Sequence, residues 1–239
     1  INAAGTMTAL GSSAAIEEAR QAADALLPWF VEIDDLQRLA SRAIAASTGA
    51  EAGFVTAGAS AGITLCIAGA MSGPDIAGIR KLPDATGMRH EVVVQDGHLV
   101  DYGAPLDQAI RLAGARIVPV AQGAGAADRL RSALGANTAA ALYVVSHHVD
   151  GSGQIPLADF ADICRARGVP VIVDAASEYD LTGFIGTGAD LVITSAHKFL
   201  GGLTAGIVAG RRKLVRAAYL QNLGIGRGMK VGKEGIIGT

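Results

Sequence analysis

The sequence predicts an α/β fold, a three-layer α/β/α domain built on a mostly parallel seven-stranded sheet with one antiparallel strand. Short apolar runs rich in β-branched residues alternate with helical patterns, which is typical of a parallel sheet covered by helices on both faces. Half of the 239 residues are apolar and 18% are charged, so the chain can bury a large core.

The predicted strands are short apolar runs bounded by turn residues. They cover residues 53–56, 91–95, 116–120, 139–145, 169–173, 189–194 and 205–208. The last strand follows its predecessor after about ten residues with no helix between them, and a parallel crossover needs a dozen or more. We therefore expect this strand to be antiparallel.

The predicted helices have apolar residues at helical spacing. They cover residues 12–27, 34–46, 63–71, 105–113, 127–134, 156–167 and 211–221. Pro28 is expected to end the first helix, and Gly49 is the stop signal of the second. Residues 73–89 are rich in Gly, Pro and Asp and are predicted to be a loop. No linker divides the chain, so residues 1–239 are predicted to be one large domain.

The composition argues against several classes of protein. A net charge of −2 leaves no electrostatic footprint for nucleic acid, and we expect no nucleic-acid partner. No apolar run is long enough to span a bilayer, so no membrane association is expected. Cys66 and Cys164 lie far apart in apolar helical patterns, which predicts buried thiols and a cytoplasmic setting. The N-terminal Ile1 and the absence of a natural tail composition suggest that the chain is part of a longer protein.

Polar residues that follow apolar strands are the candidates for a functional site, because open α/β sheets bind ligands beyond the carboxyl ends of their strands. Lys198 follows one such strand, and Asp174 ends the strand before it. Gly58, Ala59 and Ser60 form a small-residue turn between a strand and a helix, a layout that presents backbone N–H groups to an anion. This turn is equally compatible with close helix packing alone.

These groups match the needs of pyridoxal 5′-phosphate, which requires an anion cradle, an acceptor for its ring N–H and a lysine. Lys198 is then a Schiff-base lysine, although a solvated lysine after a strand is the simpler interpretation. Asp174 is then the partner of the ring nitrogen, although helix capping or metal binding are common roles for such a residue.

The remaining candidates are less specific. His98 is placed to stack on the cofactor ring, or it is a turn residue. Ser195 could donate to the phosphate or close a local turn. His147 and His148 suggest a metal, but no further ligand has suitable spacing, so we expect no metal. We interpret the two histidines as substrate-pocket or loop residues, with His147 the candidate for a substrate contact.

Six motifs occur in a specific order along the chain. They are INAAGT at 1–6 followed by Leu10-Gly11, TAGASAG at 56–62, VQDGH at 94–98, VDAA at 173–176, SAHK at 195–198 and GRGMKVGKE at 226–234. With these motifs the chain resembles fold-type I pyridoxal-phosphate enzymes. The resemblance is to the branch that contains selenocysteine synthase (L-seryl-tRNA selenium transferase) and D-glucosaminate-6-phosphate ammonia-lyase.

The resemblance implies roles for individual residues. The implied catalytic residues are Lys198 and Asp174. Arg227 and Lys230 are candidates for binding an anionic substrate, although a solvated basic face is the default interpretation of both. The implied cofactor contacts are Gly58, Ala59, Ser60, His98, Asp174, Ala176, Ser195 and Lys198. The chain departs from the family pattern at His197, where Gly or Asp is usual, and at Gly228, where Pro is frequent.

The resemblance also implies a homodimer or higher homo-oligomer and a small C-terminal domain beyond residue 239. The favoured function is a lyase that releases ammonia from an amino acid or amino sugar acid by α,β-elimination. A selenium transferase acting on seryl-tRNA is the alternative, but it would need clustered basic residues. A non-catalytic pyridoxal-phosphate-binding protein is a third possibility. A Rossmann dehydrogenase is disfavoured because no G-x-G-x-x-G follows the first strand.

Overall fold

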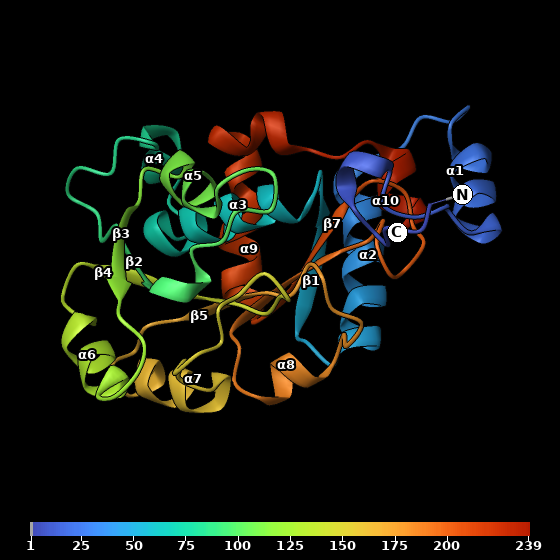
Figure 1. Ribbon diagram of the computed structural model, residues 1–239. Helices are drawn as coiled ribbons and strands as arrows, with labels where there is room; N and C mark the ends of the chain where they lie inside the picture. The colour runs from blue at the N-terminus through green and yellow to red at the C-terminus, as the bar shows by residue number, and fades with distance from the viewer. Residues whose placement is uncertain (1) are drawn as a thin grey trace.

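The computed structural model describes residues 2–239, and its centre is one seven-stranded sheet of order β1-β7-β6-β5-β4-β2-β3 (Figure 1). The strands are Ala52–Thr56 (β1), Glu91–Gln95 (β2), Arg116–Val120 (β3), Thr138–Val144 (β4), Val171–Asp174 (β5), Leu191–Ser195 (β6) and Gly206–Gly210 (β7). Strand β7 is antiparallel to both β1 and β6, and the other pairs are parallel. The predicted sheet and its single antiparallel strand are confirmed.

Helices cover both faces of the sheet. The α-helices are Glu17–Leu26 (α1), Ile33–Thr48 (α2), Ala59–Ser72 (α3), Ile76–Lys81 (α4), Leu106–Leu112 (α5), Ala126–Ala133 (α6), Leu157–Ala166 (α7), Gly183–Gly186 (α8), Arg212–Leu220 (α9) and Lys233–Gly238 (α10). The 3-10 turns are Thr8–Leu10 (η1), Asp96–His98 (η2), Gln221–Leu223 (η3) and Ile225–Met229 (η4).

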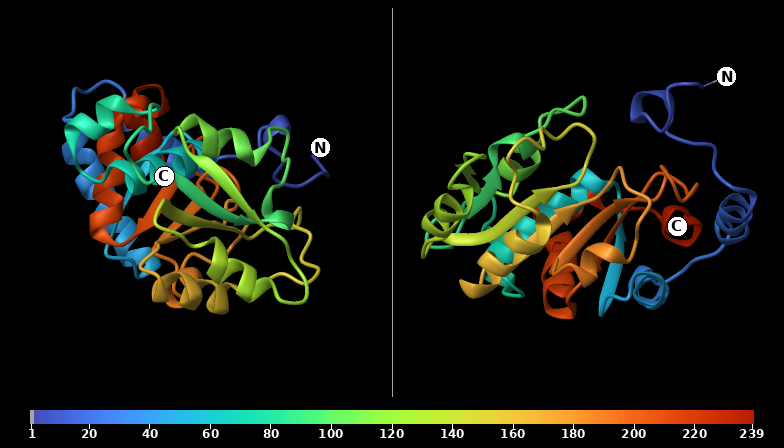
Figure 2. Two further views of the ribbon diagram at one scale, coloured as in Figure 1. Left: turned by 90° about the vertical axis from the view of Figure 1, so that its left-hand side faces the viewer. Right: turned by 60° about the horizontal axis from the view of Figure 1, so that its bottom comes forward.

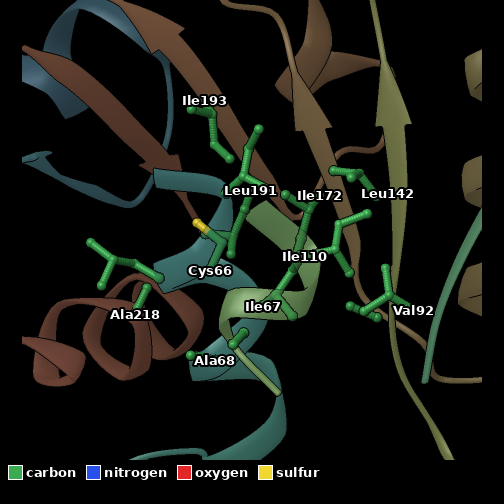
Figure 3. Close-up of a cluster of buried hydrophobic side chains, with 14 of the residues drawn as sticks. Cys66, Ile67, Ala68, Val92, Ile110, Leu142, Ile172, Leu191, Ile193 and Ala218 are labelled. Carbon is green, nitrogen blue, oxygen red and sulfur yellow. The ribbon is translucent and has the colours of Figure 1, made fainter. Parts of the chain in front are cut away.

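The core is split by the sheet into layers. Helices α3, α5 and α9 pack on one face, where α3 is apolar on nearly all sides and lies in the middle (Figure 3). Helices α6 and α7 cover the opposite face together with the short α8. Helices α2 and α10 extend that second layer over β1 and β7. Successive residues of a strand pack into the two layers in turn. Phe54 packs in the layer of α3, whereas Val55 packs in the layer of α2.

Two segments differ from the sequence predictions. The first helix begins at Glu17 rather than at residue 12, because Ser12 has a left-handed φ of 60° and Ile16, just before Glu17, is extended. Residues 73–89 contain α4, which begins where the Asp75 side chain accepts a hydrogen bond of 2.7 Å from the N–H of Gly78. A side-chain cap of this kind stabilises even a single helical turn.

The first and the last α-helices of the chain lie side by side. Helix α1 contacts α10, and the right-hand view of Figure 2 shows the N-terminal segment running along the outside of the molecule to α1. The predicted stop at Gly49 is confirmed, since this glycine ends α2 with a left-handed φ of 74°. Ile1, the first residue of the INAAGT motif, lies outside the described residues.

Candidate active site

The antiparallel insertion of β7 brings the ends of three other strands together. Gly206, the first residue of β7, pairs with Thr56 at the end of β1 and with Ser195 at the end of β6. Asp174 ends β5, which is the next strand beyond β6. The residues that follow β1, β5 and β6 therefore share one edge of the sheet, as predicted for a ligand site of an open α/β fold.

The turn between β1 and α3 forms an anion-binding layout at this edge. The first N–H groups of a helix have no intrahelical partner, and the helix dipole adds positive potential there. Gly58 precedes this helix, and a Cβ atom added to it would meet no heavy atom of the described residues within 4 Å. A Cβ on Gly206 would lie 2.4 Å from the carbonyl carbon of Gly58. The turn is thus packed closely against β7 on one side and open on the other, where Ala59 is partly exposed and Ser60 is exposed.

Asp174 is the buried carboxyl group of the site. Its side chain is 6% exposed as part of β5, and its Oδ1 accepts a hydrogen bond of 3.1 Å from the N–H of Ala176. Burial raises the pKa of Asp174 to about 6, while the Ala176 N–H and the charge of Lys198 act in the opposite direction. A carboxyl group in this environment favours a nearby cationic partner, such as a protonated ring nitrogen.

Lys198 lies on the loop 196–205 that joins β6 to β7, which we call the lysine loop. Its side chain is half-buried, and its Nζ lies 3.5 Å from the Oγ of Ser177 in the segment that follows β5. The charge of Lys198 also acts on Asp174. The structure therefore brings the two predicted catalytic residues together, although 24 positions separate them in the sequence.

Ser195 and His197 are linked just before the lysine. The Oγ of Ser195 and the Nδ1 of His197 are 3.3 Å apart, and the same Nδ1 lies 3.3 Å from the carbonyl oxygen of Ala205. The imidazole thus bridges the two ends of the lysine loop. This contact gives His197, the residue that departs from the family pattern, a local structural role.

His98 is completely buried, with 0% of its surface exposed. Its Nδ1 accepts a hydrogen bond of 3.0 Å from the N–H of Val144, and its Nε2 lies 3.1 Å from the Oε1 of Gln154. Burial lowers the pKa of His98, so the ring is neutral, and its partners favour a proton on Nε2. Its edge-to-face contact with Tyr143 fills one side of the ring. The predicted stacking on a cofactor would require this ring to become exposed.

Tyr102 is a further residue near the site, and the sequence interpretation assigned it no individual role. It follows η2 on an exposed loop, and 39% of its surface is accessible. Burial raises the pKa of its hydroxyl, the Ser60 side chain lowers it, and the charge of Asp174 raises it again. Tyr102 therefore lies near both Ser60 and Asp174. Its only sequence signal was its position after a predicted strand.

The predicted substrate residues lie at the same edge with exposed side chains. Arg227 and Lys230 belong to the segment around η4, which is attached to the end of β1 through the carbonyl oxygen of Met229. That oxygen accepts bonds from the Ala57 N–H at 3.2 Å and from the Thr56 Oγ1 at 3.0 Å. The two cations are thus positioned beside the anion-binding turn.

His147 follows β4 on the same sheet edge, and its ring is tilted against that of His148 with centroids 4.0 Å apart. Both histidines are exposed. Within residues 2–239, no three His, Cys, Asp or Glu side chains are grouped so that they could hold a metal ion. In the same residues, no helix has the length and apolar composition needed to cross a bilayer. Two open surface depressions lie away from Lys198, one over β3 and α6 and one between α6 and α7.

The fold and the lysine–carboxylate pair at the sheet edge define a class of protein. The aminotransferase class-V family model matches residues 84–231, and the chain belongs to this family.

Known relatives refine this assignment. The chain is 44% identical over all 239 residues to D-glucosaminate-6-phosphate ammonia lyase of Salmonella typhimurium, and it spans 65% of the length of that relative. A solved structure of D-glucosaminate-6-phosphate ammonia-lyase superposes on this chain with a TM-score of 0.97 at 44% sequence identity. The match covers 100% of this chain and 65% of the chain in that structure.

Two further relatives match part of the chain. The 5′-C-glycyluridine monooxygenase-decarboxylase of a Streptomyces species is 47% identical over 153 residues, which are 62% of this chain and 38% of that protein. The L-seryl-tRNA(Sec) selenium transferase of Moorella thermoacetica is 31% identical over 150 residues, 53% of this chain and 31% of that protein. The predicted resemblance to the ammonia-lyase and selenocysteine synthase branch is confirmed.

Proposed function

We propose that residues 1–239 form the large domain of a pyridoxal-phosphate-dependent enzyme and that the cofactor is held at the edge described above. The donor set fits this group. The open space beside Gly58 and the free N–H groups of α3 suit the phosphate, and Ser60 and Ser195 add hydroxyl donors. The buried carboxyl group of Asp174, with its raised pKa, suits a protonated ring nitrogen.

Lys198 is proposed to bind the cofactor aldehyde and to move a proton at the α-carbon of the substrate. The cofactor supplies an electron sink that allows a bond to this carbon to break. The half-buried Nζ of Lys198 lies near Asp174 and Ser177, where it can be held in one orientation. Asp174 holds the ring nitrogen, and Ala176 in turn fixes Asp174 through its N–H. His147 remains a proposed contact of the substrate, and His98 remains a proposed contact of the ring that requires its buried side chain to become exposed.

The proposed reaction is α,β-elimination from an amino acid or amino sugar acid, with release of ammonia. Loss of the α-proton and of a β-hydroxyl group as water leaves an enamine, whose hydrolysis takes up water and gives a keto acid and ammonia. Arg227 and Lys230 are proposed to bind the anionic groups of such a substrate, because both are exposed beside the anion-binding turn. The identity of 44% over the full length of the chain to an ammonia lyase is the observation that carries this proposal.

The test compares the parent chain with Lys198→Ala. Purified parent protein incubated with pyridoxal phosphate is expected to show the absorbance band of a protonated imine. Reduction with borohydride should then leave a pyridoxyl label on the peptide that contains Lys198. The variant should lose both signals. Labelling of the Lys198→Ala variant, or a parent protein that is not labelled, would contradict the proposal.

A second candidate reaction is favoured by the identity of 47% to the monooxygenase-decarboxylase over 62% of the chain. An ammonia lyase releases ammonia, whereas a monooxygenase consumes oxygen. Amino sugar phosphates and glycyl nucleosides should therefore be tested in parallel for ammonia release and for oxygen uptake. Ammonia release without oxygen uptake supports the lyase, and the reverse result supports the oxygenase.

We further propose that the protein is a cytoplasmic homo-oligomer. Both cysteines are buried and free, and burial raises the pKa of the Cys164 thiol to about 12, which suits a reducing compartment. Trp29 is 67% exposed and Phe30 is fully exposed on the segment between α1 and α2. Neighbouring large apolar side chains of this kind are typical of surfaces that contact another subunit.

A further inference from the structure

The lysine loop is held from outside by the N-terminal part of the chain. Residues 12–16, which we call the strap, precede α1 and form neither a helix nor a strand. The Oγ of Ser13 donates a hydrogen bond of 2.8 Å to the carbonyl oxygen of His197. The N–H of Ile16 donates a second bond of 2.8 Å to the carbonyl oxygen of Gly201. The strap therefore binds the loop on both sides of Lys198.

The loop is shaped to receive the strap. Gly201 has a left-handed φ of 64°, and a Cβ atom there would lie 2.7 Å from the Cγ2 of Ile16. Glycine is thus required both for the turn and for the close approach of the strap. Within the loop, the N–H of Gly202 donates to the carbonyl oxygen of Ala196, and the N–H of Ala196 donates to that of Ala205, each at 3.0 Å.

Ser12 shows that this arrangement has an energetic cost. It has a φ of 60°, which is rare for residues other than glycine, and only 4% of its surface is exposed. Its Oγ is buried without a hydrogen-bond partner among the described residues. Backbone strain and an unsatisfied buried hydroxyl both oppose folding, and strain of this kind clusters at functional sites. Both unfavourable features belong to Ser12, which immediately precedes Ser13 and its contact with the lysine loop.

The bond from Ser13 acts on the peptide group that carries Lys198. The carbonyl group of His197 and the nitrogen of Lys198 belong to one planar peptide unit. Fixing the oxygen of this unit fixes the plane from which the Lys198 side chain extends. A small rotation of that plane would move the distant Nζ away from Ser177 and Asp174. Ser13 does not need to touch the cofactor to have this effect.

We propose that Ser13 is a positioning residue that orients Lys198 by holding the peptide between His197 and Lys198. This inference rests on the proposed role of Lys198 and adds the strap to the machinery of the site. If the strap only attached α1 to the fold, loss of the Ser13 hydroxyl would change stability without changing the reactivity of Lys198.

The experiment uses the full chain and its variant Ser13→Ala, with Ser13→Thr as rescue. Ser132→Ala is the matched control, because the Ser132 Oγ also donates to a backbone carbonyl, at 2.9 Å, on the remote helix α6. Amide exchange of the peptide covering residues 196–203 is measured in the apoprotein. The rate at which borohydride fixes pyridoxal phosphate on Lys198 is measured by peptide mapping.

Loss of one hydrogen bond is expected to speed exchange in the lysine loop and to slow labelling of Lys198, each by about tenfold at most. Ser13→Thr should restore both rates, and Ser132→Ala should change neither. If Ser13→Ala does not fold, Ser13→Cys keeps the size with a weaker donor and takes its place. Labelling of Lys198 at the parent rate in both Ser13→Ala and Ser13→Thr would overturn the positioning role alone. A parent protein unlabelled at Lys198 would overturn the proposed function and the positioning role together.

Discussion

At the scale of single residues, Asp174 lies at the candidate site, where burial disfavours its charged form. Burial raises its pKa from 3.8 to about 6, so the folded chain binds this proton more tightly than the unfolded chain. Its contribution to stability is therefore complete below about pH 4 and is lost as the pH rises to about 6. A difference of about two pKa units corresponds to about 3 kcal/mol, which is an upper limit for this loss.

We predict that Asp174→Asn stabilises the apoprotein above pH 6, because an amide accepts the Ala176 N–H without a charge. Urea unfolding at about pH 4.5 and pH 8 should give a gain that grows with pH. Asp159→Asn, on an exposed position of α7, is the control and should show no such trend. An equal change in the free energy of unfolding at both pH values would contradict the assignment. The same variant should lose lyase activity.

At the scale of elements, the crossing of α3 and α9 holds the anion-binding turn in place, since α3 begins at that turn. Gly69 lies at the crossing, and a Cβ atom there would meet the backbone nitrogen of Ala218 at 2.6 Å. The surrounding residues are closely packed, as Figure 3 shows for Cys66 and Ala218. Backbone atoms cannot move aside as a flexible side chain would, so the two helices would have to separate.

We predict that Gly69→Ala lowers the free energy of unfolding by about 1–3 kcal/mol despite the higher helix propensity of alanine. Gly135→Ala is the control, since a Cβ atom at that position meets no heavy atom of the described residues within 4 Å. Denaturant unfolding of both variants checks the prediction. A Gly69→Ala protein as stable as the parent would show that the crossing is looser than the structure indicates.

The elements also show why part of the structure could be predicted from the sequence. The strands and most helices could be predicted from local periodicity. Asp174 and Lys198 could be predicted to lie at one site, because open α/β sheets bind ligands beyond the carboxyl ends of their strands. The strap could not be predicted, because its conformation depends on a partner 184 positions away. The same limit applies to Tyr102, whose proximity to Ser60 and Asp174 depends on the path of a loop. Helix α4 is six residues long, too short for a periodic signal.

At the scale of the whole molecule, the exposed pair Trp29 and Phe30 should determine the state of assembly. We predict that the double substitution Trp29→Ser and Phe30→Ser lowers the molar mass measured by light scattering to that of one chain, with an unchanged circular dichroism spectrum. Loss of large aromatic anchors weakens an interface most strongly. Leu112→Ser, at a 58% exposed position that ends α5, is the control and should leave the mass unchanged. A parent protein that is already monomeric would contradict the proposed assembly.

The position of β7 has a consequence for synthesis on the ribosome. In the described sheet β1 pairs with β7 and not with the strands that follow it in the chain, so the N-terminal strand lacks its neighbour until residues 206–210 have emerged. Strands β2 to β6 are parallel neighbours and can associate earlier. The two halves of the candidate site, the turn after β1 and the lysine loop, are therefore joined in the last stage of folding. A nascent chain that stops short of β7 can build much of the sheet while the turn after β1 is still separate from the lysine loop.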